Sequence, residues 1–274
     1  MNLFPGSITR NALSVVHRSW WSGQVIEVVD DGPLRLLHFG TYLKQSCILR
    51  ANPRRLVLPY TRSMLTVLLF QRQPGRVLMI GLGGGTMARF LLDHFPECQI
   101  DAVEIVPEMP ELARRYFGLP QSSRLRVSIG DGADFLHFAA RQAVVPRYDL
   151  LLVDAFDAAG MAATIYAEAF FRDCRALLTD NGVMAVNLSR GREEVFRQSL
   201  AAIDLLFDQA TRQFRPEGSN NVILLAACRP ESLRLRPGFA DGCERVTRLV
   251  PPFSDLFSPG DLLTLPWWRY VREF

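Results

Sequence analysis

Hydrophobic residues in this chain occur in short runs that alternate with stretches of helical periodicity. The run at 77–80 is too short for a helix and is followed by glycines, a combination typical of a buried parallel strand. From Thr86 the apolar positions recur at helical spacing, and the next apolar run, 99–105, carries Glu104 near its end. Residues 76–104 therefore predict a strand, a glycine turn, a helix and a second strand.

The same alternation continues to residue 228 and predicts a doubly wound α/β sheet. Further strands are expected at 125–129, 148–153 and 183–188, and helices at 108–117, 133–141, 166–178 and 193–207. The last two strands, 209–214 and 221–228, have no helix between them and should form an antiparallel hairpin at the sheet edge. In Rossmann-like sheets of this kind, ligands lie at the carboxyl ends of the strands.

The pattern before residue 58 is that of antiparallel strands. Residues 24–40 alternate around a turn at 30–33, which predicts a hairpin, and 42–49 is expected to add a third strand. Trp20 and Trp21 are expected to pack on the body of the protein. The expected parts are a small β domain (1–57), a nucleoside-binding catalytic domain (58–230) and an extension that packs on the body or a partner subunit (231–274).

Composition and charge narrow the function further. The chain has 274 residues, 49% of them hydrophobic, and a formal net charge of +3 with scattered arginines, so no nucleic-acid partner is expected. Five cysteines without a C-x-x-C pair predict a reduced, cytoplasmic protein. The chain lacks an apolar run of membrane length, and its four histidines show no metal-ligand spacing, so we expect no membrane association and no metal.

The glycine turn carries the strongest chemical signal. Gly81, Gly83, Gly84 and Gly85 allow a sharp turn and a close approach of a ligand to the backbone, next to the N-terminus of the following helix. Glu104 ends the next strand, where a carboxylate can accept both hydroxyls of a ribose. The G-x-G-x-G spacing favours S-adenosylmethionine or a relative over a dinucleotide. The alternative is a tight turn without a ligand.

Two further acids fall at the same edge of the predicted sheet. Asp131 and Asp154 each follow a strand, as Glu104 does. Asp154 can hold an amine nucleophile and take or relay its proton, and Asp157 can anchor a second positive group. The alternative is that Asp154 and Asp157 only cap the segments that follow them.

The order of these motifs resembles the spermidine synthase family, the polyamine aminopropyltransferases, from about residue 24 to 228. The glycine loop, Gly130-Asp131-Gly132, the D-x-x-D at 154–157 and the segment 164–171 are similar to the family's motifs, and the loop and Glu104 are shared with class I methyltransferases. The resemblance implies a class I methyltransferase-type sheet with Asp131 at the adenine amino group. It implies donor binding by Gln45, Gly81, Gly83, Gly84, Gly85, Glu104, Ile105, Asp131 and Gly132.

The chain also departs from the family pattern. Gly84 stands where the family's loop has an Asp that meets the amino end of a decarboxylated donor, so a repulsion against a donor carboxylate is removed. Arg215 stands where the family has Tyr, and Asn187 where it has Gln. In the helix before the glycine loop, the family's Y-x-E-M appears as residues 61–64, so its Glu is replaced by the serine that follows Arg62. If Arg62 and Arg215 face the pocket, they would repel a cationic diamine and could pair a carboxylate; the alternative for both is an exposed edge. The expected substrate-binding residues are Tyr60, Arg62, Asn187 and Arg215.

Three functions follow from these observations. The first is a transferase that moves a methyl or aminocarboxypropyl group from S-adenosylmethionine to a small nucleophile, with Asp154 and Asp157 as the catalytic residues. The second is a polyamine aminopropyltransferase that uses decarboxylated S-adenosylmethionine and a diamine. The third is a nucleoside-binding protein without turnover. The expected partners are a small-molecule acceptor and a second copy of the chain in a homodimer.

Overall fold

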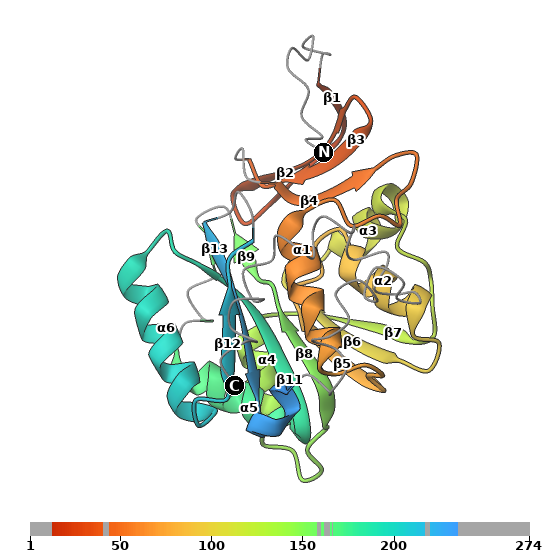
Figure 1. The fold of residues 1–274 in the computed structure, drawn as a ribbon. Helices are drawn as coiled ribbons and strands as arrows, with labels where there is room; N and C mark the ends of the chain where they lie inside the picture. The colour runs from red at the N-terminus through yellow and green to blue at the C-terminus, as the bar shows by residue number, and fades with distance from the viewer. Residues whose placement is uncertain are drawn as a thin grey trace, which may run out of the picture.

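The computed structural model of the protein describes residues 13–40, 44–157, 160–161, 165, 167–216 and 220–234. Within this part a seven-stranded sheet lies beneath a four-stranded sheet (Figure 1). The aromatic stretch 261–270, which we expected to pack on the body or a partner, lies outside the described residues.

The central sheet has the order β12-β13-β11-β8-β5-β6-β7. Its strands are β5 (Arg76–Ile80), β6 (Gln99–Glu104), β7 (Leu125–Ile129), β8 (Tyr148–Val153), β11 (Leu178–Ser189), β12 (Thr211–Phe214) and β13 (Asn221–Ala227). Strands β11, β8, β5, β6 and β7 pair in parallel, whereas β13 pairs antiparallel with β11 and β12. The predicted α/β fold and its antiparallel edge hairpin are confirmed.

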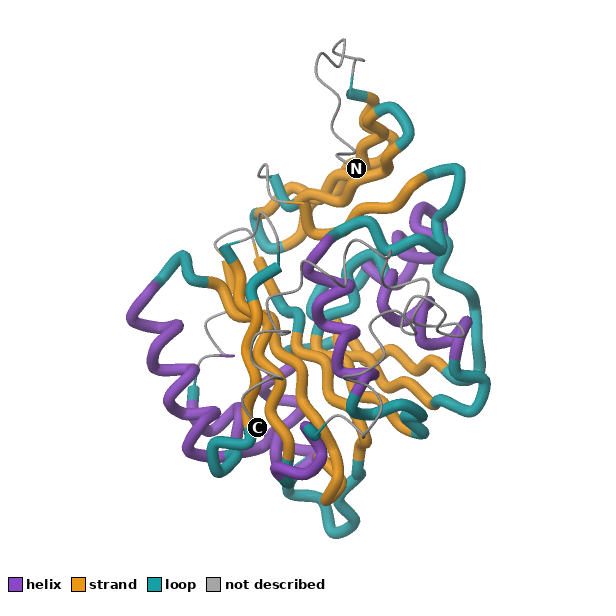
Figure 2. Tube along the Cα trace, viewed as in Figure 1, coloured by secondary structure: helices purple, strands orange, loops and turns teal. Residues whose placement is uncertain are grey.

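Helices cover both faces of this sheet, as Figure 2 shows. One face carries α1 (Pro59–Met64), the 3-10 helix η1 (Leu65–Leu69) and α2 (Thr86–His94), and the other carries α4 (Gly132–Ala139), α5 (Glu168–Leu177) and α6 (Glu193–Leu206). Val77 and Met79 of β5 enter one core and Leu78 and Ile80 the other. This two-residue alternation explains why the strand is apolar throughout.

The small sheet consists of β1 (Ser14–Trp21), β2 (Gln24–Asp31), β3 (Leu34–His38) and β4 (Lys44–Leu49), paired antiparallel in that order. It packs on α3 (Met109–Phe117) through a shared core that includes Val28, Leu37 and Phe117. The predicted hairpin and third strand are confirmed, but β1 was not predicted. Trp20 is 66% exposed on β1, so the expectation that it packs on the body is wrong.

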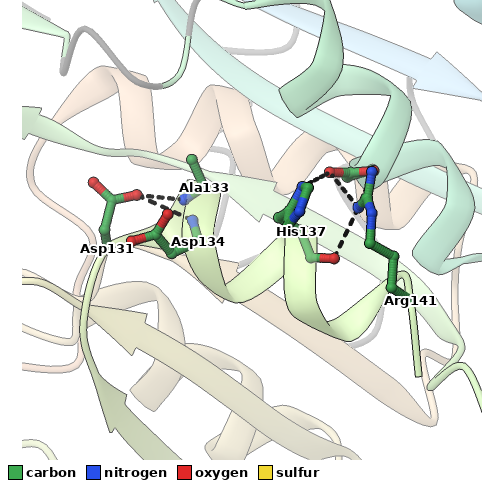
Figure 3. Close-up of polar contacts among 6 residues, drawn as sticks. Asp131, Ala133, Asp134, His137 and Arg141 are labelled. Carbon is green, nitrogen blue, oxygen red and sulfur yellow. Dashed lines mark hydrogen bonds and ion pairs between the residues drawn. The ribbon is translucent and has the colours of Figure 1, made fainter.

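Polar contacts hold helix α4, whose N-cap residue is Asp131, against α5. Arg141 Nη1 donates to both carboxylate oxygens of Asp173 at 3.2 Å and to the His137 carbonyl oxygen at 2.8 Å (Figure 3). His137 Nδ1 lies 3.6 Å from the Asp173 carboxylate. Asp173 is buried, so this cluster ties the two helices together.

The structure also differs from the prediction in three smaller ways. β11 begins at 178, so residues 180–182, expected to end the preceding helix, lie within this strand. Two short strands, β9 (Phe156–Asp157) and β10 (Gly160–Met161), pair antiparallel after β8. The short 3-10 helix η3 (Pro230–Leu233) follows β13. In the described part of the chain, every helix is too short or too polar to cross a membrane.

Candidate active site

A cavity of about 650 Å³ lies at the carboxyl ends of β5, β6 and β8 and beneath the start of β4. This volume lies in the usual range of small-ligand sites. Most of the predicted site residues line it: Gln45, Tyr60, Gly81, Gly83, Glu104, Ile105, Asp131, Gly132, Asp154 and Asn187. Residues from the ends of β5, β6, β7 and β8, from β11 and α1, and from the small sheet are thus brought together. The predicted sheet topology requires that the ends of the parallel strands meet at one edge.

The glycine loop begins where two strand ends meet. Gly81 has φ +93°, and its amide donates to the Val103 carbonyl oxygen at 2.8 Å. A Cβ at this position would overlap the Asp154 carbonyl oxygen and lie 2.9 Å from the carbonyl carbon. Glycine is therefore required here because the backbone carrying Asp154 passes directly against the loop.

Glu104 fixes the next part of the loop. Its Oε2 accepts from the amides of Leu82 at 2.9 Å and Gly83 at 3.2 Å, and its Oε1 accepts from Val106 at 2.9 Å. The side chain is buried but lines the cavity. A carboxylate has about four acceptor directions, so about one remains beside these three amides. For Glu104 to accept hydrogen bonds from both ribose hydroxyls, one of its hydrogen bonds from these backbone amides would have to lengthen.

Asp131 is the N-cap residue of α4. Its Oδ1 accepts from the amides of Ala133 at 2.7 Å and Asp134 at 3.3 Å, as Figure 3 shows. These bonds satisfy two amides of the first helical turn and hold the carboxylate beside the cavity. The position suits the predicted contact with an adenine amino group, and the capping role explains its orientation.

Asp154 lies beside Asn187 and Tyr60. Its Oδ1 accepts from Asn187 Nδ2 at 2.9 Å. Burial raises the pKa of Asp154 to about 6, and the charge of Glu104 adds to the rise, whereas the Asn187 hydrogen bond and the neighbouring Tyr60 hydroxyl lower it. Tyr60 donates its hydroxyl proton to the Gln45 carbonyl oxygen at 3.1 Å. The pKa of Tyr60 is raised well above its ordinary value, first by burial and then by the charge of Asp154. A carboxyl group with a pKa near neutrality is suited to hold and exchange a proton.

The Asn187 side chain leaves one polar atom without a partner. An ionised carboxylate only accepts hydrogen bonds, so the amide NH₂ group must face Asp154 and the amide oxygen must face away from it. Asn187 is 2% exposed, and among the described residues its Oδ1 finds no donor. A buried acceptor of this kind is costly unless a ligand supplies a donor. The pair therefore suits a bound N–H group.

Four predicted site residues of the described part of the chain do not line the cavity: Arg62, Arg215, Gly84 and Gly85. Tyr60 and Thr61 of α1 line it, but Arg62 lies about 100° further around the helix and is turned away. Arg215 is exposed after β12, at the far edge of the sheet. The substrate-binding role expected of these arginines therefore finds no support, and the alternative of an exposed edge agrees with Arg215. The sequence motif fixed neither the helix rotation nor the strand order.

Gly84 and Gly85 shape the loop without lining the cavity. A Cβ at Gly84 would lie 2.9 Å from Ser46 Cβ and 3.0 Å from Phe117 Cγ, and one at Gly85 would lie 3.0 Å from Leu119. Close packing therefore explains these glycines. Asp157 belongs to β9, but its side chain lies outside the described residues.

Sequence reasoning missed the polar residues that flank Gln45. Lys44 and Ser46 line the cavity from β4, and Ser46 Oγ accepts from the Gly84 amide at 2.8 Å. Their only sequence signal was their adjacency to Gln45. The described residues contain no group of three or more His, Cys, Asp or Glu side chains that could hold a metal.

A Rossmann-like sheet with a glycine loop held by Glu104 and acids at the neighbouring strand ends has the arrangement of a nucleoside-binding site. The chain belongs to the spermine/spermidine synthase family, because residues 58–213 match the family's Spermine/spermidine synthase domain. The family resemblance predicted from the motifs is confirmed.

Two relatives show the range of proteins to which this chain is similar. A polyamine aminopropyltransferase of Chromobacterium violaceum is 35% identical over 163 residues, which cover 59% of this chain and 60% of the relative. An eEF1A lysine and N-terminal methyltransferase of Mus musculus is 36% identical over 192 residues, which cover 66% of this chain and 27% of the relative. The chain thus spans less than two thirds of the length of each of these relatives.

Solved structures agree with the fold. Human Methyltransferase-like protein 13, in complex with SAH, has a TM-score of 0.58 and 27% identity, covering 77% of this chain and 94% of that one. Spermidine synthase from Thermotoga maritima has a TM-score of 0.69 over 91% of this chain and 82% of that one, at 17% identity. Both matches agree with the α/β fold described above.

Proposed function

We propose that this protein transfers a methyl or aminocarboxypropyl group from S-adenosylmethionine to a small nucleophile held by Asp154. The observation that carries the proposal is the position of Asp154. It lies at a strand end beside the glycine loop, in a cavity of about 650 Å³, with a pKa raised to about 6. An acid of this kind is ionised at neutral pH but lies close enough to neutrality to exchange a proton.

The chemistry is an in-line displacement at a carbon bound to the sulfonium sulfur. The nucleophile's lone pair forms the new bond, the carbon–sulfur bond breaks, and its electron pair leaves the sulfur as a neutral thioether. An amine nucleophile must be uncharged to attack, so its proton goes to the Asp154 carboxylate or through it to water. The Asn187 amide oxygen offers a second acceptor that orients the amine, and the cavity holds both reactants close.

The donor is proposed to be intact S-adenosylmethionine because the glycine loop carries no acidic side chain. At Gly84, where the related aminopropyltransferases are expected to present an Asp to the amino end of the donor, the backbone packs directly on Ser46 and Phe117. A donor carboxylate therefore meets no opposing carboxylate from the loop. The two arginines that we expected to pair this carboxylate give no support, since neither lines the cavity.

A second candidate function is polyamine aminopropyl transfer from decarboxylated S-adenosylmethionine to a diamine. It is favoured by the relative of that name at 35% identity and by Gln45, Asp131 and Asp154, which all line the cavity. The two functions differ in the charge of the donor tail and of the acceptor, and so they can be separated by binding and product analysis.

The test is calorimetric titration with S-adenosylmethionine, decarboxylated S-adenosylmethionine and methylthioadenosine, followed by mass spectrometry of products. The first function predicts tighter binding of the carboxylated donor and a mass gain of a methyl or aminocarboxypropyl group on an acceptor. Tighter binding of the decarboxylated donor with an aminopropylated diamine would establish the second. Nucleoside binding without a product from either donor, across a panel of amines, thiols and carboxylates, would indicate a binding protein.

We also propose that the protein is cytoplasmic and acts as a homodimer on a small molecule, without a nucleic-acid or membrane partner. The apolar side chains exposed on the edge strand β1 and just before it support an interface there, since Trp20 is 66% and Leu13 65% exposed. Light scattering gives the mass in solution, and a monomeric mass at micromolar concentration would contradict the dimer.

A further inference from the structure

Lys44 has an unusual position in this chain. Of the 31 basic residues, 30 are arginines and Lys44 is the single lysine. Within the described part of the protein it is also the only basic side chain that lines the cavity, where Glu104, Asp131 and Asp154 supply carboxylates. Among the described residues, the one positively charged side chain of the cavity is thus at the beginning of β4.

Ser46 places a hydrogen-bond donor near this charge. It is 6% exposed, lines the cavity, and its Oγ accepts from the Gly84 amide at 2.8 Å. A serine hydroxyl that accepts a bond still has its own proton to donate. No donation by Ser46 to another described residue is seen, so this proton is available to a ligand in the cavity.

The contact between Ser46 and Gly84 places the Ser46 hydroxyl close to Glu104, the carboxylate expected to hold the ribose. The Gly83 amide donates to Glu104, and the next amide of the loop, that of Gly84, donates to Ser46. Ser46 and Glu104 are thus hydrogen-bonded to adjacent loop residues. The substituents of a sulfonium bound there lie next to the ribose. The small sheet therefore offers a hydroxyl and an ammonium group to the tail of the donor.

We propose that Lys44 and Ser46 form a subsite for the carboxylate of the donor's aminocarboxypropyl tail. The inference rests on the proposed function, since it requires an S-adenosyl nucleoside in the cavity. Ser46 donates its hydroxyl proton to the carboxylate, and the Lys44 ammonium group attracts it through charge. A decarboxylated donor has only an ammonium group at this end, which Lys44 repels, so the subsite selects the intact donor.

Calorimetric titration of three variants tests this subsite. Lys44→Gln removes the charge, Lys44→Arg keeps it, and Arg50→Gln removes a charge from the turn directly after β4, outside the cavity lining. Lys44→Gln should weaken S-adenosylmethionine binding about fivefold, the most expected of a solvent-exposed ion pair, and leave methylthioadenosine unchanged because it has no carboxylate. Lys44→Arg and Arg50→Gln should bind both ligands as the wild type does.

The outcomes separate this inference from the proposed function. Unchanged S-adenosylmethionine affinity in Lys44→Gln, or an equal loss for methylthioadenosine, would overturn the subsite while leaving nucleoside binding intact. Failure of the wild type to bind any of the nucleosides would instead overturn the proposed function. Raising the salt concentration should reduce the wild type's preference for the carboxylated donor over methylthioadenosine and affect Lys44→Gln less, because exposed charges are screened.

The single lysine permits a second, independent measurement. An amine-acylating reagent can modify only Lys44 and the N-terminal amine of this chain. S-adenosylmethionine should slow acylation of Lys44 more than methylthioadenosine does, as measured by peptide mass spectrometry with the N-terminal amine as internal reference. Equal protection by the two ligands would argue against contact between Lys44 and the carboxylate.

Discussion

At Asp154, burial and hydrogen bonding have opposing effects on the same carboxyl group. Burial is the larger effect and raises the pKa to about 6, although Asn187 and Tyr60 both stabilise the ionised form. The ionised group is therefore held at a cost in stability that an exposed aspartate would not have. Such costs are common at groups that carry out chemistry, which agrees with the role proposed for Asp154.

Asp154→Asn should abolish transfer and stabilise the protein at neutral pH. Because the folded pKa lies above the ordinary 3.8, folding favours the protonated form, and stability falls as pH rises from about 4 to about 6. The variant escapes this loss, which amounts to at most about 3 kcal/mol above pH 6, and should match the wild type below about pH 4. Denaturant unfolding across pH 3.5–8 measures the difference, with exposed Asp134→Asn as the control.

The same titration sets the pH dependence of catalysis. Wild-type kcat/KM should decline as pH falls through about 6, because the carboxylate must be ionised to take a proton. Nucleoside affinity of Asp154→Asn should stay close to that of the wild type, as measured by calorimetry. Loss of both activity and nucleoside affinity would show that Asp154 is needed for the architecture of the site.

At the scale of elements, the carboxyl ends of the strands fix the acids, and secondary-structure contacts orient them. Glu104 receives amides from the loop after β5 and from its own strand end, and Asp131 caps α4. Each acid is thus held by backbone groups before any ligand is present. Such preorganisation reduces the free energy needed to order the site on binding.

Asp131 should have separable roles in helix capping and nucleoside binding. Asp131→Ala removes the acceptor of the Ala133 and Asp134 amides and should lower the free energy of unfolding by about 1 kcal/mol, whereas Asp131→Asn keeps a capping oxygen and should lose less. Both variants should weaken nucleoside binding if the carboxylate also holds the adenine amino group. Denaturant unfolding and calorimetry measure the two effects, with exposed Asp134→Ala as the matched control.

At the scale of the whole molecule, two sheets build one cavity. Gln45 and Ser46 come from the small sheet, whereas Glu104 and Asp154 come from the central sheet. The two sheets are joined by the core around α3 and by the bond from Gly84 to Ser46. A ligand in the cavity therefore contacts both and should stabilise their association.

Methylthioadenosine should accordingly slow amide hydrogen exchange in both sheets at once. Protection is expected in β4 and in the loop from Gly81 to Thr86, which are separated by over thirty residues in the chain but both contribute residues to the same cavity. Hydrogen-exchange mass spectrometry with and without the nucleoside measures this. Protection confined to the central sheet would mean that the small sheet does not take part in nucleoside binding.

The sequence by itself determined the order of strands and helices in the central domain, because strand runs and helical periodicity depend on neighbouring residues. It also placed Glu104, Asp131 and Asp154 at one edge, since parallel strands end on the same side of a sheet. The family motifs added Gln45, which lies in the cavity as expected.

Only the tertiary structure decided which side chains face the ligand from elsewhere in the chain. The rotation of α1 turns Arg62 away, and the strand order leaves Arg215 at the sheet edge. The docking of the small sheet brings Lys44 and Ser46 to a loop about forty residues later. These positions depend on packing between elements, which periodicity along a single chain does not encode.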